Sequence, residues 1–454
     1  MLRLHDTASG AARGLEPRDP GKVSMYVCGP TVYDLPHIGH GRQLLVYDVL
    51  RRYLEWCGLE VHHVSNITDV DDKIIGRAQR EGRTEAEVAA QFEQAWYDAV
   101  DALGVLRPHH DPHATAYVPE MVELIARLVG AGVAYETGDG VYFGVEAVDG
   151  YGLLAGQSPE SLRAGERVEV VDEKRSPADF ALWKKAKPDE PSWPSPWGQG
   201  RPGWHTECVV MSLKLLGDGF DLHAGGMDLR FPHHENERAQ AVALGHAFAR
   251  HWMHHAFVEM GGEKMSKSLG NFVTLTDLVE RTDPRAYRLL VLQSHYRSPL
   301  EVLPETIERA ERTLAKLDEL NRRWEALGDR RPAGAEADRA ALDRVRTLMD
   351  DDLATPAVTG LLFDLVAAAN TALAAGDLDA AAPTVAAVLE VAGALGLAPR
   401  AADTALDEET ARLVAERDAA RAARDFARSD AIRERLTALG WVVQDTPQGT
   451  TVHR

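Results

Sequence analysis

The sequence predicts an α/β fold in which a parallel sheet is interrupted by an insertion and followed by helices. Three observations lead to this prediction. Two short buried strands flank an amphipathic helix near the start, a stretch rich in proline and tryptophan breaks that pattern, and the last third is rich in Ala, Leu, Arg and Glu. Because 454 residues exceed what one hydrophobic core usually covers, we expect several structural units.

The first predicted element is a strand over 22–28, which ends at Gly29 and Pro30. A helix follows and stops at Gly58, and its apolar residues recur at three- and four-residue steps: Val46, Val49, Leu50, Tyr53, Leu54 and Cys57. A second strand covers about 59–64. Strand, helix and strand with short connections indicate a right-handed βαβ unit of a Rossmann-like parallel sheet. Such sheets bind ligands at the carboxyl ends of their strands, where Cys28 and Thr68 lie.

The pattern changes from about 112 to 202, which we interpret as an insertion with strand-like pieces at 140–145 and 167–171. The sheet is expected to resume with a helix near 206–216 and strands at 220–224 and 257–260. Beyond 304 the pattern is helical, and it ends in a helical segment over 407–439 and an extended tail over 441–454. We therefore expect four units: a catalytic domain of 1–111 and 203–303, the insertion of 112–202, a helical bundle of 304–400 and a C-terminal domain of 401–454.

The composition favours a cytoplasmic protein without a membrane partner. Three cysteines are too few for a disulfide framework, and residues 1–21 are too polar for a signal peptide. The alanine-rich stretch 380–398 contains Pro383 and Glu390, so a soluble helix explains it better than a membrane span. A net charge of −20 argues against indiscriminate nucleic-acid binding, although a local basic face still permits a specific nucleic-acid partner.

Two distant motifs together predict an ATP site. His37, Gly39 and His40 lie where the first strand turns into its helix, and a helix N-terminus favours phosphate. Gly39 lets a ligand approach the backbone, and the two imidazoles can donate hydrogen bonds to a triphosphate. Lys264 and Lys267 lie three residues apart between glycines, in a loop that can close over the phosphates. Histidines near a turn are usually polar loop residues, and a lysine–serine loop is usually a solvated turn. The prediction of an ATP site therefore rests on the occurrence of both motifs together.

A second set of residues predicts a zinc site. Cys28 closes the first strand, Cys208 lies on the helix near 206–216, and His233 and Glu237 share one helix face after Pro232. Two thiolates, an imidazole and a carboxylate suit zinc. The alternative, that a cysteine is a small buried hydrophobe, is our interpretation for Cys57 but not for Cys28. His234 is the less favoured ligand of the adjacent pair, because Glu237 shares a face with His233.

Catalytic zinc usually has three protein ligands, and four are counted here. Either the ion becomes five-coordinate or Glu237 loosens when substrate binds. Both alternatives remain open at the level of the sequence.

The pair of ATP motifs resembles the signature of class I aminoacyl-tRNA synthetases. Over nearly its whole length, and most clearly at 25–34, 203–208, 231–237 and 264–271, the chain resembles the cysteinyl-tRNA synthetase family. This resemblance implies activation of L-cysteine by ATP and Mg²⁺, transfer to the 3′-terminal adenosine of tRNA(Cys), and one zinc ion per chain that binds the substrate thiolate. It assigns catalytic and ATP-binding roles to five residues: His37, Gly39, His40, Lys264 and Lys267.

The same resemblance implies that four residues line the amino-acid pocket: Thr68, Trp204, His223 and Asp228. Asp228 suits the α-ammonium group, and Trp204 suits the pocket floor. The structural alternatives are a strand-end cap for Thr68, a core aromatic for Trp204 and loop polar residues for His223 and Asp228. We expect a monomer.

The C-terminal segment predicts a tRNA contact. Arginines fall at steps of four, three and four and would form one basic stripe: Arg417, Arg421, Arg424 and Arg428. A salt-bridged solvated face is the alternative. The tail 445–451 resembles the end of the family's anticodon-binding domain, which adds Asp445 and, as a stacking surface, Trp441 to the expected tRNA contacts. The family often has an aromatic residue just after that tail, where this chain has Val452 and His453.

Two other functions were weighed. A ligase that joins cysteine to an amino sugar in mycothiol synthesis would share the ATP and zinc sites but lack the anticodon-binding tail. A non-catalytic tRNA-binding paralogue acting as a regulator would have lost parts of the ATP motifs, and both motifs are intact.

Overall fold

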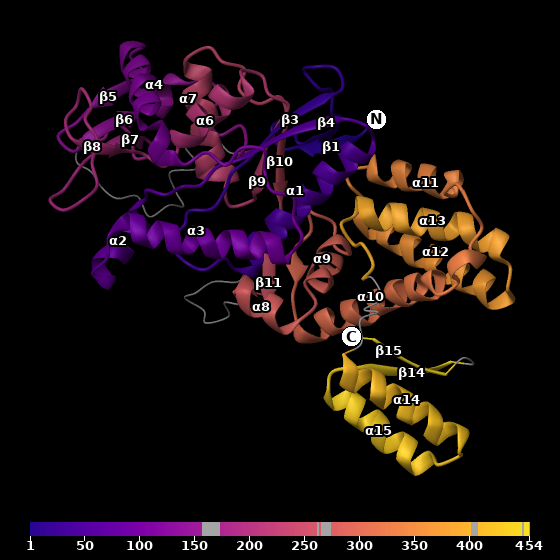
Figure 1. Cartoon of the computed structure of the whole chain (residues 1–454). Coiled ribbons are helices and arrows are strands. Elements are labelled where there is room, and N and C mark those ends of the chain that lie inside the picture. The colour runs from indigo at the N-terminus through magenta and orange to yellow at the C-terminus, as the bar shows by residue number, and fades with distance from the viewer. Residues whose placement is uncertain (157–172, 261–262, 265–273, 401–406, 447–448, 454) are drawn as a thin grey trace. The chain divides into compact units, whose positions relative to one another are not determined.

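The computed structural model describes residues 1–156, 173–260, 263–264, 274–400, 407–446 and 449–453 (Figure 1). The predicted strand at 167–171 and most of the lysine loop, 265–268, lie outside the described residues. The chain divides into two compact units. The larger comprises 1–315 with 332–398, and the smaller comprises 316–331 with 399–454.

A four-stranded parallel sheet forms the centre of the larger unit. Its strand order is β10-β9-β3-β4, with β3 at Lys22–Val27, β4 at Glu60–Ser65, β9 at Leu222–Gly226 and β10 at Trp252–His255. Helix α1 (Ile38–Trp56) connects β3 to β4, which confirms the predicted βαβ unit. The chain leaves β3 toward β4 and later adds β9 on the other side of β3. The crevice for a ligand is therefore expected at the carboxyl ends of β3 and β9, where the strand order reverses.

One predicted strand lies in a different sheet. β11 (Val258–Met260) pairs with β12 (Glu263–Lys264) and β13 (Leu300–Glu301), not with the parallel sheet. The parallel sheet gains β10 instead, whose Trp252-Met253-His254-His255 run is buried throughout. Sequence reasoning missed β10 because two of its four residues are polar, and only the tertiary structure covers both faces of that strand.

Helix α1 begins and ends at recognisable caps. His37 is its N-cap, and Gly58 follows its C-cap with a left-handed φ of 85°. Two helices, α2 (Asp72–Glu81) and α3 (Glu85–Ala102), follow β4 and bury a separate small core that includes Ile74, Phe92 and Trp96. Helix α3 reaches the histidine motif, because the ring of its Trp96 meets that of His40 edge-on with centroids 5.7 Å apart; Figure 1 shows α3 passing near α1.

The insertion folds as an antiparallel sheet with a helix. It contains α4 (Val118–Gly130), β5 (Ala134–Glu136), β6 (Gly140–Phe143), β7 (Phe180–Lys185) and β8 (Gly200–Pro202). The chain then returns through α6 (Glu207–Leu216), a π-helical turn (Arg230–His234) and α7 (Glu235–Ala243). One hydrophobic cluster joins buried residues of the insertion, such as Trp183, to Tyr26 of the parallel sheet and Val209 of α6. The insertion therefore shares its core with the catalytic sheet.

Apart from short 3₁₀ turns, the described part of residues 1–400 also contains a hairpin and six helices: β1 (Arg3–Asp6), β2 (Ala11–Gly14), α8 (Leu275–Arg281), α9 (Pro284–Leu292), α10 (Pro304–Glu325), α11 (Arg339–Met349), α12 (Thr355–Ala375) and α13 (Leu378–Ala394). Among the described helices, α12 alone is long and apolar enough to cross a membrane. Length and composition are weak criteria, since core helices of globular proteins also meet them, and α12 packs against α13.

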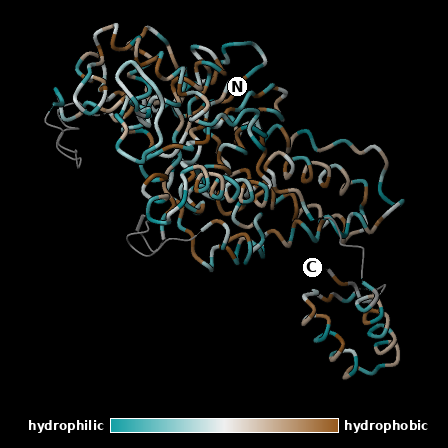
Figure 2. Tube along the Cα trace, turned by 60° about the vertical axis from the view of Figure 1, so that its left-hand side comes forward, coloured by the Kyte–Doolittle hydropathy of each residue, from teal (hydrophilic) through white to brown (hydrophobic). Residues whose placement is uncertain are grey.

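Besides the end of α10, the described part of the smaller unit contains a 3₁₀ turn (Gly328–Arg330), two helices and a hairpin: α14 (Glu408–Ala422), α15 (Phe426–Ala438), β14 (Val442–Thr446) and β15 (Gly449–His453). The single helical segment predicted over 407–439 is thus wrong, because the chain turns at Arg424, whose φ is 59°. Hydrophobic and hydrophilic residues alternate along both helices (Figure 2). Their apolar faces meet the hairpin in a core of Leu413, Ile432, Leu436, Trp441 and Val443.

Candidate functional site

A cavity of about 280 Å³ opens at the carboxyl ends of β3, β9 and β10. Five of the residues predicted to bind ATP or the amino acid line it: His37, Gly39, His40, Trp204 and Asp228. Lys73 and His255 also line it, although no sequence motif had singled them out. The histidine motif and part of the predicted amino-acid pocket therefore share one cavity.

His37 and His40 fix each other at the start of α1. His37 Nδ1 accepts the backbone N–H of His40 at 3.3 Å, and His40 Nδ1 accepts that of His37 at 3.2 Å. The rings stack with centroids 3.7 Å apart. Burial, and then the neighbouring His37, lower the pKa of His40 well below 6.5, so its ring is neutral near pH 7. With Nδ1 an acceptor, the single proton lies on Nε2, which makes Nε2 a hydrogen-bond donor.

The lysine loop begins in the small sheet that contains β11 and ends beside this motif. The backbone of Lys264 pairs with Glu259 in the small three-stranded sheet. At the other end, Thr274 bridges to His37, and the backbone N–H of Leu275 donates to Pro36 O at 2.7 Å. Lys267 lies outside the described residues, so its role stays a prediction.

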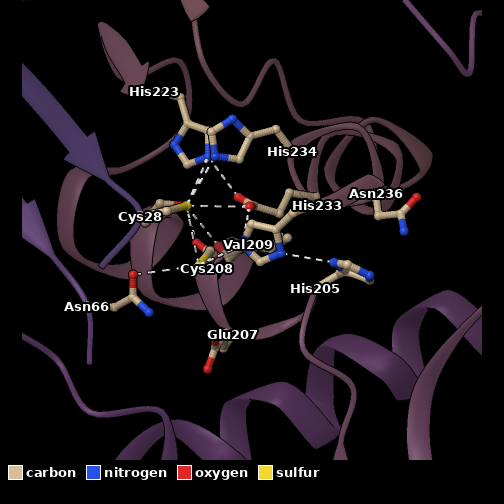
Figure 3. Close-up of polar contacts among 12 residues, drawn as sticks. Cys28, Asn66, His205, Glu207, Cys208, Val209, His223, His233, His234 and Asn236 are labelled. Carbon is tan, nitrogen blue, oxygen red and sulfur yellow. Dashed lines mark hydrogen bonds and ion pairs between the residues drawn. The ribbon is translucent and has the colours of Figure 1, made fainter. Parts of the chain in front are cut away.

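The predicted zinc ligands converge in one buried cluster (Figure 3). One ligand atom from each of Cys28, Cys208, His233 and Glu237 lies within 4.8 Å of the others, and all four residues are buried. The two sulfur atoms are 3.8 Å apart, and His233 Nε2 lies 3.6 Å from Cys208 Sγ and 2.9 Å from Glu237 Oε1. The i, i+4 relation of His233 and Glu237 places both on one face, as predicted.

The electrostatics of this cluster suit a cation. Burial raises the pKa of Cys28 well above 9.0. Burial also acts to raise the pKa of Cys208, but hydrogen bonds with Cys28 and His233 lower it to about 6. Against the effect of burial, the charges of Glu237 and Cys208 raise the pKa of His233 to about 10. Several acidic groups thus crowd a dry site, and His233 compensates them as a cation.

Two further histidines extend the cluster. Cys28, His223, His234 and Glu237 form a second group whose ligand atoms also lie within 4.8 Å of one another. His223 Nε2 lies 2.8 Å from Glu237 Oε2, and His234 Nε2 lies 3.2 Å from Cys28 Sγ. Figure 3 shows the rings of His223 and His234 together on one side of Cys28, with His233 near Cys208. His234 also reaches the site, as the N-cap of α7 directly after His233, and the chain enters this helix start through Phe231, whose backbone is extended with φ −142° and ψ 135°.

The donor set fits zinc. Sulfur and imidazole ligands with one carboxylate suit this borderline-soft ion, whereas Mg²⁺ and Ca²⁺ prefer oxygen alone. The structure supplies the four predicted donors within reach of a single ion and keeps His223 and His234 in contact with them. The residues present therefore fit the implied metal.

Two predicted pocket residues lie elsewhere. Thr68 is 2 % exposed and His223 is fully buried, so both stand beside the cysteines and not on the cavity surface. Thr68 donates a hydrogen bond to Glu207, and Asn66 links the backbone N–H of Gly29 to the hydroxyl of Thr68. Asn66 and Glu207 were missed by the sequence analysis, although Glu207 is the direct neighbour of Cys208.

Trp204 joins the metal cluster to the cavity. Its ring stacks on His233 with centroids 4.2 Å apart, and the side chain is 39 % exposed. The alternative of a core aromatic is excluded by this exposure. A neighbouring residue, His205, approaches His233 from the same segment, with 2.9 Å between their Nδ1 atoms.

The arginines of the smaller unit do not form one stripe. Arg417 is 1 % exposed and donates to Asp445 at 2.6 Å and to Thr450 at 2.7 Å. Arg421 pairs with Asp445 at 3.1 Å, Arg424 occupies the interhelical turn, and Arg428 lies on the other helix near Glu416. Trp441 is 3 % exposed, so its predicted stacking surface is also wrong. The contacts of Arg421, Arg424, Arg428 and Asp445 with tRNA stay predictions.

Three family models match the chain. A class I (C) catalytic domain of tRNA synthetases matches 15–312, a DALR domain matches 344–399, and an anticodon-binding domain of cysteinyl-tRNA ligases matches 403–452. The first alone covers more than half of the chain.

Curated relatives match from end to end. The cysteine–tRNA ligase of Anaeromyxobacter dehalogenans strain 2CP-C is 48% identical, with 99% of each chain covered. That of Halorhodospira halophila is 45% identical over 100% of both chains, and that of Thermus thermophilus is 47% identical over 99% of this chain and 98% of its own.

Solved structures show the same fold at low identity. The methionyl-tRNA synthetase of Mycobacterium tuberculosis with methionyl-adenylate superposes with a TM-score of 0.61 at 17% identity, covering 83% of this chain and 90% of that one. The LeuRS of Agrobacterium radiobacter K84 gives 0.61 at 12% identity, covering 84% and 85%. The class I fold predicted from the sequence is therefore confirmed, and by its family models and full-length relatives the chain belongs to the cysteinyl-tRNA ligase family.

Proposed function

We propose that this chain activates L-cysteine with ATP to form cysteinyl-adenylate and transfers the cysteine to the 3′-terminal adenosine of tRNA(Cys). The observation that carries the proposal is the position of the cysteine–histidine–glutamate cluster beside the cavity that His37 and His40 line, since Gly29, which follows Cys28, and Trp204, which stacks on His233, both line that cavity. A zinc ion held by Cys28, Cys208, His233 and Glu237 supplies a Lewis acid that lowers the pKa of a bound thiol, which serine's hydroxyl cannot match. Trp204 lies between this cluster and the cavity.

The chain's own residues position the reacting groups. ATP binds with Mg²⁺ at the N-terminus of α1, where His37 and His40 present Nε2–H donors to the phosphates. Lys264 and Lys267 add positive charge as pyrophosphate leaves. Thr274, the first described residue after the lysine loop, bridges to His37, which ties this end of the loop to the proposed phosphate site.

The amino-acid end of the cavity offers acceptors for an α-ammonium group. Asp228 supplies a carboxylate. His255 donates Nδ1–H to Ala256 O at 2.9 Å, which leaves Nε2 an acceptor without a partner among the described residues. Burial lowers the pKa of His255 to about 4, so this acceptor is neutral near pH 7. Thr68 and His223 do not line the cavity and act indirectly. Thr68 acts through its hydrogen bond to Glu207, and His223 acts through its contact with Glu237.

The C-terminal segment supports tRNA as the acceptor of the cysteine. The match of 403–452 to a cysteinyl-tRNA ligase anticodon-binding domain favours tRNA over the amino sugar of mycothiol synthesis. We further propose a cytoplasmic monomer, and we retain the division at residues 111, 202, 303 and 400 as its domain boundaries.

Two assays test the function. Cysteine-dependent ATP–pyrophosphate exchange reports adenylate formation, and charging of purified tRNA(Cys) reports transfer. Both should be active. Exchange without charging would favour an amino-sugar ligase, and absence of exchange would contradict both enzymes.

The zinc role is tested by a matched pair of variants. Cys208→Ser removes one buried thiol of the cluster, whereas Cys57→Ser changes an exposed cysteine at the end of α1. Cys208→Ser should lose bound zinc and raise the KM for cysteine by about 10²-fold or more while the KM for ATP stays within a factor of about three. Cys57→Ser should behave as wild type. An unchanged cysteine KM and zinc content in Cys208→Ser would contradict the assignment.

A further inference from the structure

A chain of hydrogen bonds leads away from the metal cluster on the side of Cys28. His234 Nε2 lies 3.2 Å from Cys28 Sγ, and His234 Nδ1 lies 2.8 Å from His254 Nε2. His254 Nδ1 in turn lies 2.7 Å from the hydroxyl oxygen of Thr7. His234 is fully buried and His254 is 4 % exposed, whereas Thr7 is half-buried just beyond β1. Thr7, His254 and His234, which are far apart in the sequence, thus form one continuous series of contacts that ends at Cys28.

The chemistry of each atom sets the direction of this line. A cysteine sulfur that binds a metal is a thiolate and can only accept a hydrogen bond. His234 must then donate through Nε2–H. In the tautomer of His234 that carries its hydrogen on Nε2, Nδ1 is an acceptor and faces His254 Nε2 at 2.8 Å, so His254 donates to it through Nε2–H. His254 Nδ1 is left as an acceptor, and the hydroxyl of Thr7 donates to it.

We propose that Thr7, His254 and His234 form a donor chain that orients the Cys28 sulfur and limits how much charge it gives to the metal. The inference rests on the proposed zinc role of the cluster. An N–H donor to a metal-bound sulfur stabilises its negative charge, as hydrogen-bonded partners of other metal ligands do. A metal that receives less charge from Cys28 is a stronger Lewis acid toward the thiol of the substrate. All three members are positioning residues, since none belongs to the four predicted ligands.

Cobalt(II) in place of zinc reports directly on this sulfur. The thiolate-to-cobalt charge-transfer band in the near ultraviolet moves to longer wavelength when the sulfur loses a hydrogen-bond donor. His254→Phe removes the donor to His234 but keeps a ring of similar size. It should shift the band to longer wavelength, weaken cobalt binding roughly 10-fold in a chelator competition, and raise the KM for cysteine more than that for ATP.

Matched variants separate this effect from general damage. His254→Gln retains an N–H in the position of Nε2 and should restore most of the wild-type band. Thr7→Ser keeps the hydroxyl and should match wild type, while Thr7→Val should shift the band in the same direction as His254→Phe but less. His251→Phe replaces another buried histidine, one residue before β10, and should leave the band unchanged.

The outcomes distinguish the two proposals. If wild-type protein binds cobalt without any charge-transfer band, the metal role of the cysteines is wrong, and this inference falls with it. If the wild-type band is present but His254→Phe leaves its position and the cobalt affinity unchanged, the donor chain is wrong while the metal site stands. A shift that His254→Gln does not reverse would also contradict the donor chain.

Discussion

His37 and His40 each use Nδ1 to accept the backbone N–H of the other, and their rings stack at 3.7 Å. The two residues therefore cap α1 and present their Nε2 donors at the same time. The sequence had predicted the pair as phosphate donors from their place at a helix start. The mutual capping could not be predicted from the sequence, because it depends on the side-chain rotamers that the packed turn allows.

Two substitutions at His40 separate its roles. In His40→Asn the amide oxygen stands in for Nδ1, so the cap remains while the Nε2 donor is lost. In His40→Gln the amide nitrogen stands in for Nε2, so the donor remains while the cap is lost. We expect His40→Asn to lower the exchange rate about 10²- to 10³-fold with little change in unfolding free energy. His40→Gln should lose less activity but about 1 kcal/mol of stability.

Exchange kinetics and urea unfolding of both variants check this. A normal rate in His40→Asn together with a rate loss in His40→Gln would show that His40 acts through the cap alone.

At the scale of elements, the metal cluster is assembled by strand ends and helix starts that are distant in the sequence. Cys28 follows β3, Cys208 lies in the first turn of α6, and His233 and Glu237 bracket the start of α7. Each element was predicted, and the parallel sheet brought their ends together as its topology requires. In the smaller unit the sequence prediction was wrong, because it treated α14 and α15 as one helical segment, whereas the chain turns between them at Arg424.

Arg417 and Arg428 provide a matched comparison in that unit. Arg417 is buried and bonded to Asp445 and Thr450, whereas Arg428 is exposed on α15. Arg417→Met should destabilise the helix–hairpin core by about 2–4 kcal/mol, because the hairpin loses its buried charged partner. Arg428→Met should change stability by less than about 0.5 kcal/mol.

Hydrogen exchange of α14, α15 and the hairpin measures both effects, and pyrophosphate exchange should stay near wild type in each variant. If Arg417→Met leaves protection in the hairpin unchanged, the structural role assigned to Arg417 is incorrect.

At the scale of the whole molecule, buried histidines link stability to pH. Burial, and then the charge of Arg51, lower the pKa of His63 to about 3, and burial lowers the pKa of His255 to about 4. The unfolded chain titrates its histidines near 6.5. Below that pH the unfolded state binds protons that the folded state does not, so stability is lost as the pH falls from about 6.5 toward 4.

The slope of this loss should reach about 1.4 kcal/mol per pH unit for each such histidine. His63 is the one to test, because neither of its ring nitrogens has a hydrogen-bond partner among the described residues. His63→Phe should fold, and the slope of its unfolding free energy against pH should be smaller by the contribution of one histidine. Urea unfolding at several pH values between 4.5 and 7.5 measures it, and an unchanged slope would mean that His63 titrates normally in the folded protein.

The sequence by itself determined the α/β class, the βαβ unit, the insertion and the place of the histidine motif at a helix start. These features depend on local periodicity, caps and residue chemistry, which neighbours in the chain carry. It did not determine the sheet to which 257–260 belongs, the burial of Trp441 and Arg417, or the exposure of Cys57. Only the tertiary structure decided these, because burial depends on which distant element covers a face. The same holds for Thr7, His254 and His234, whose alignment toward Cys28 exists only once β1, β10 and the π-helical turn are packed together.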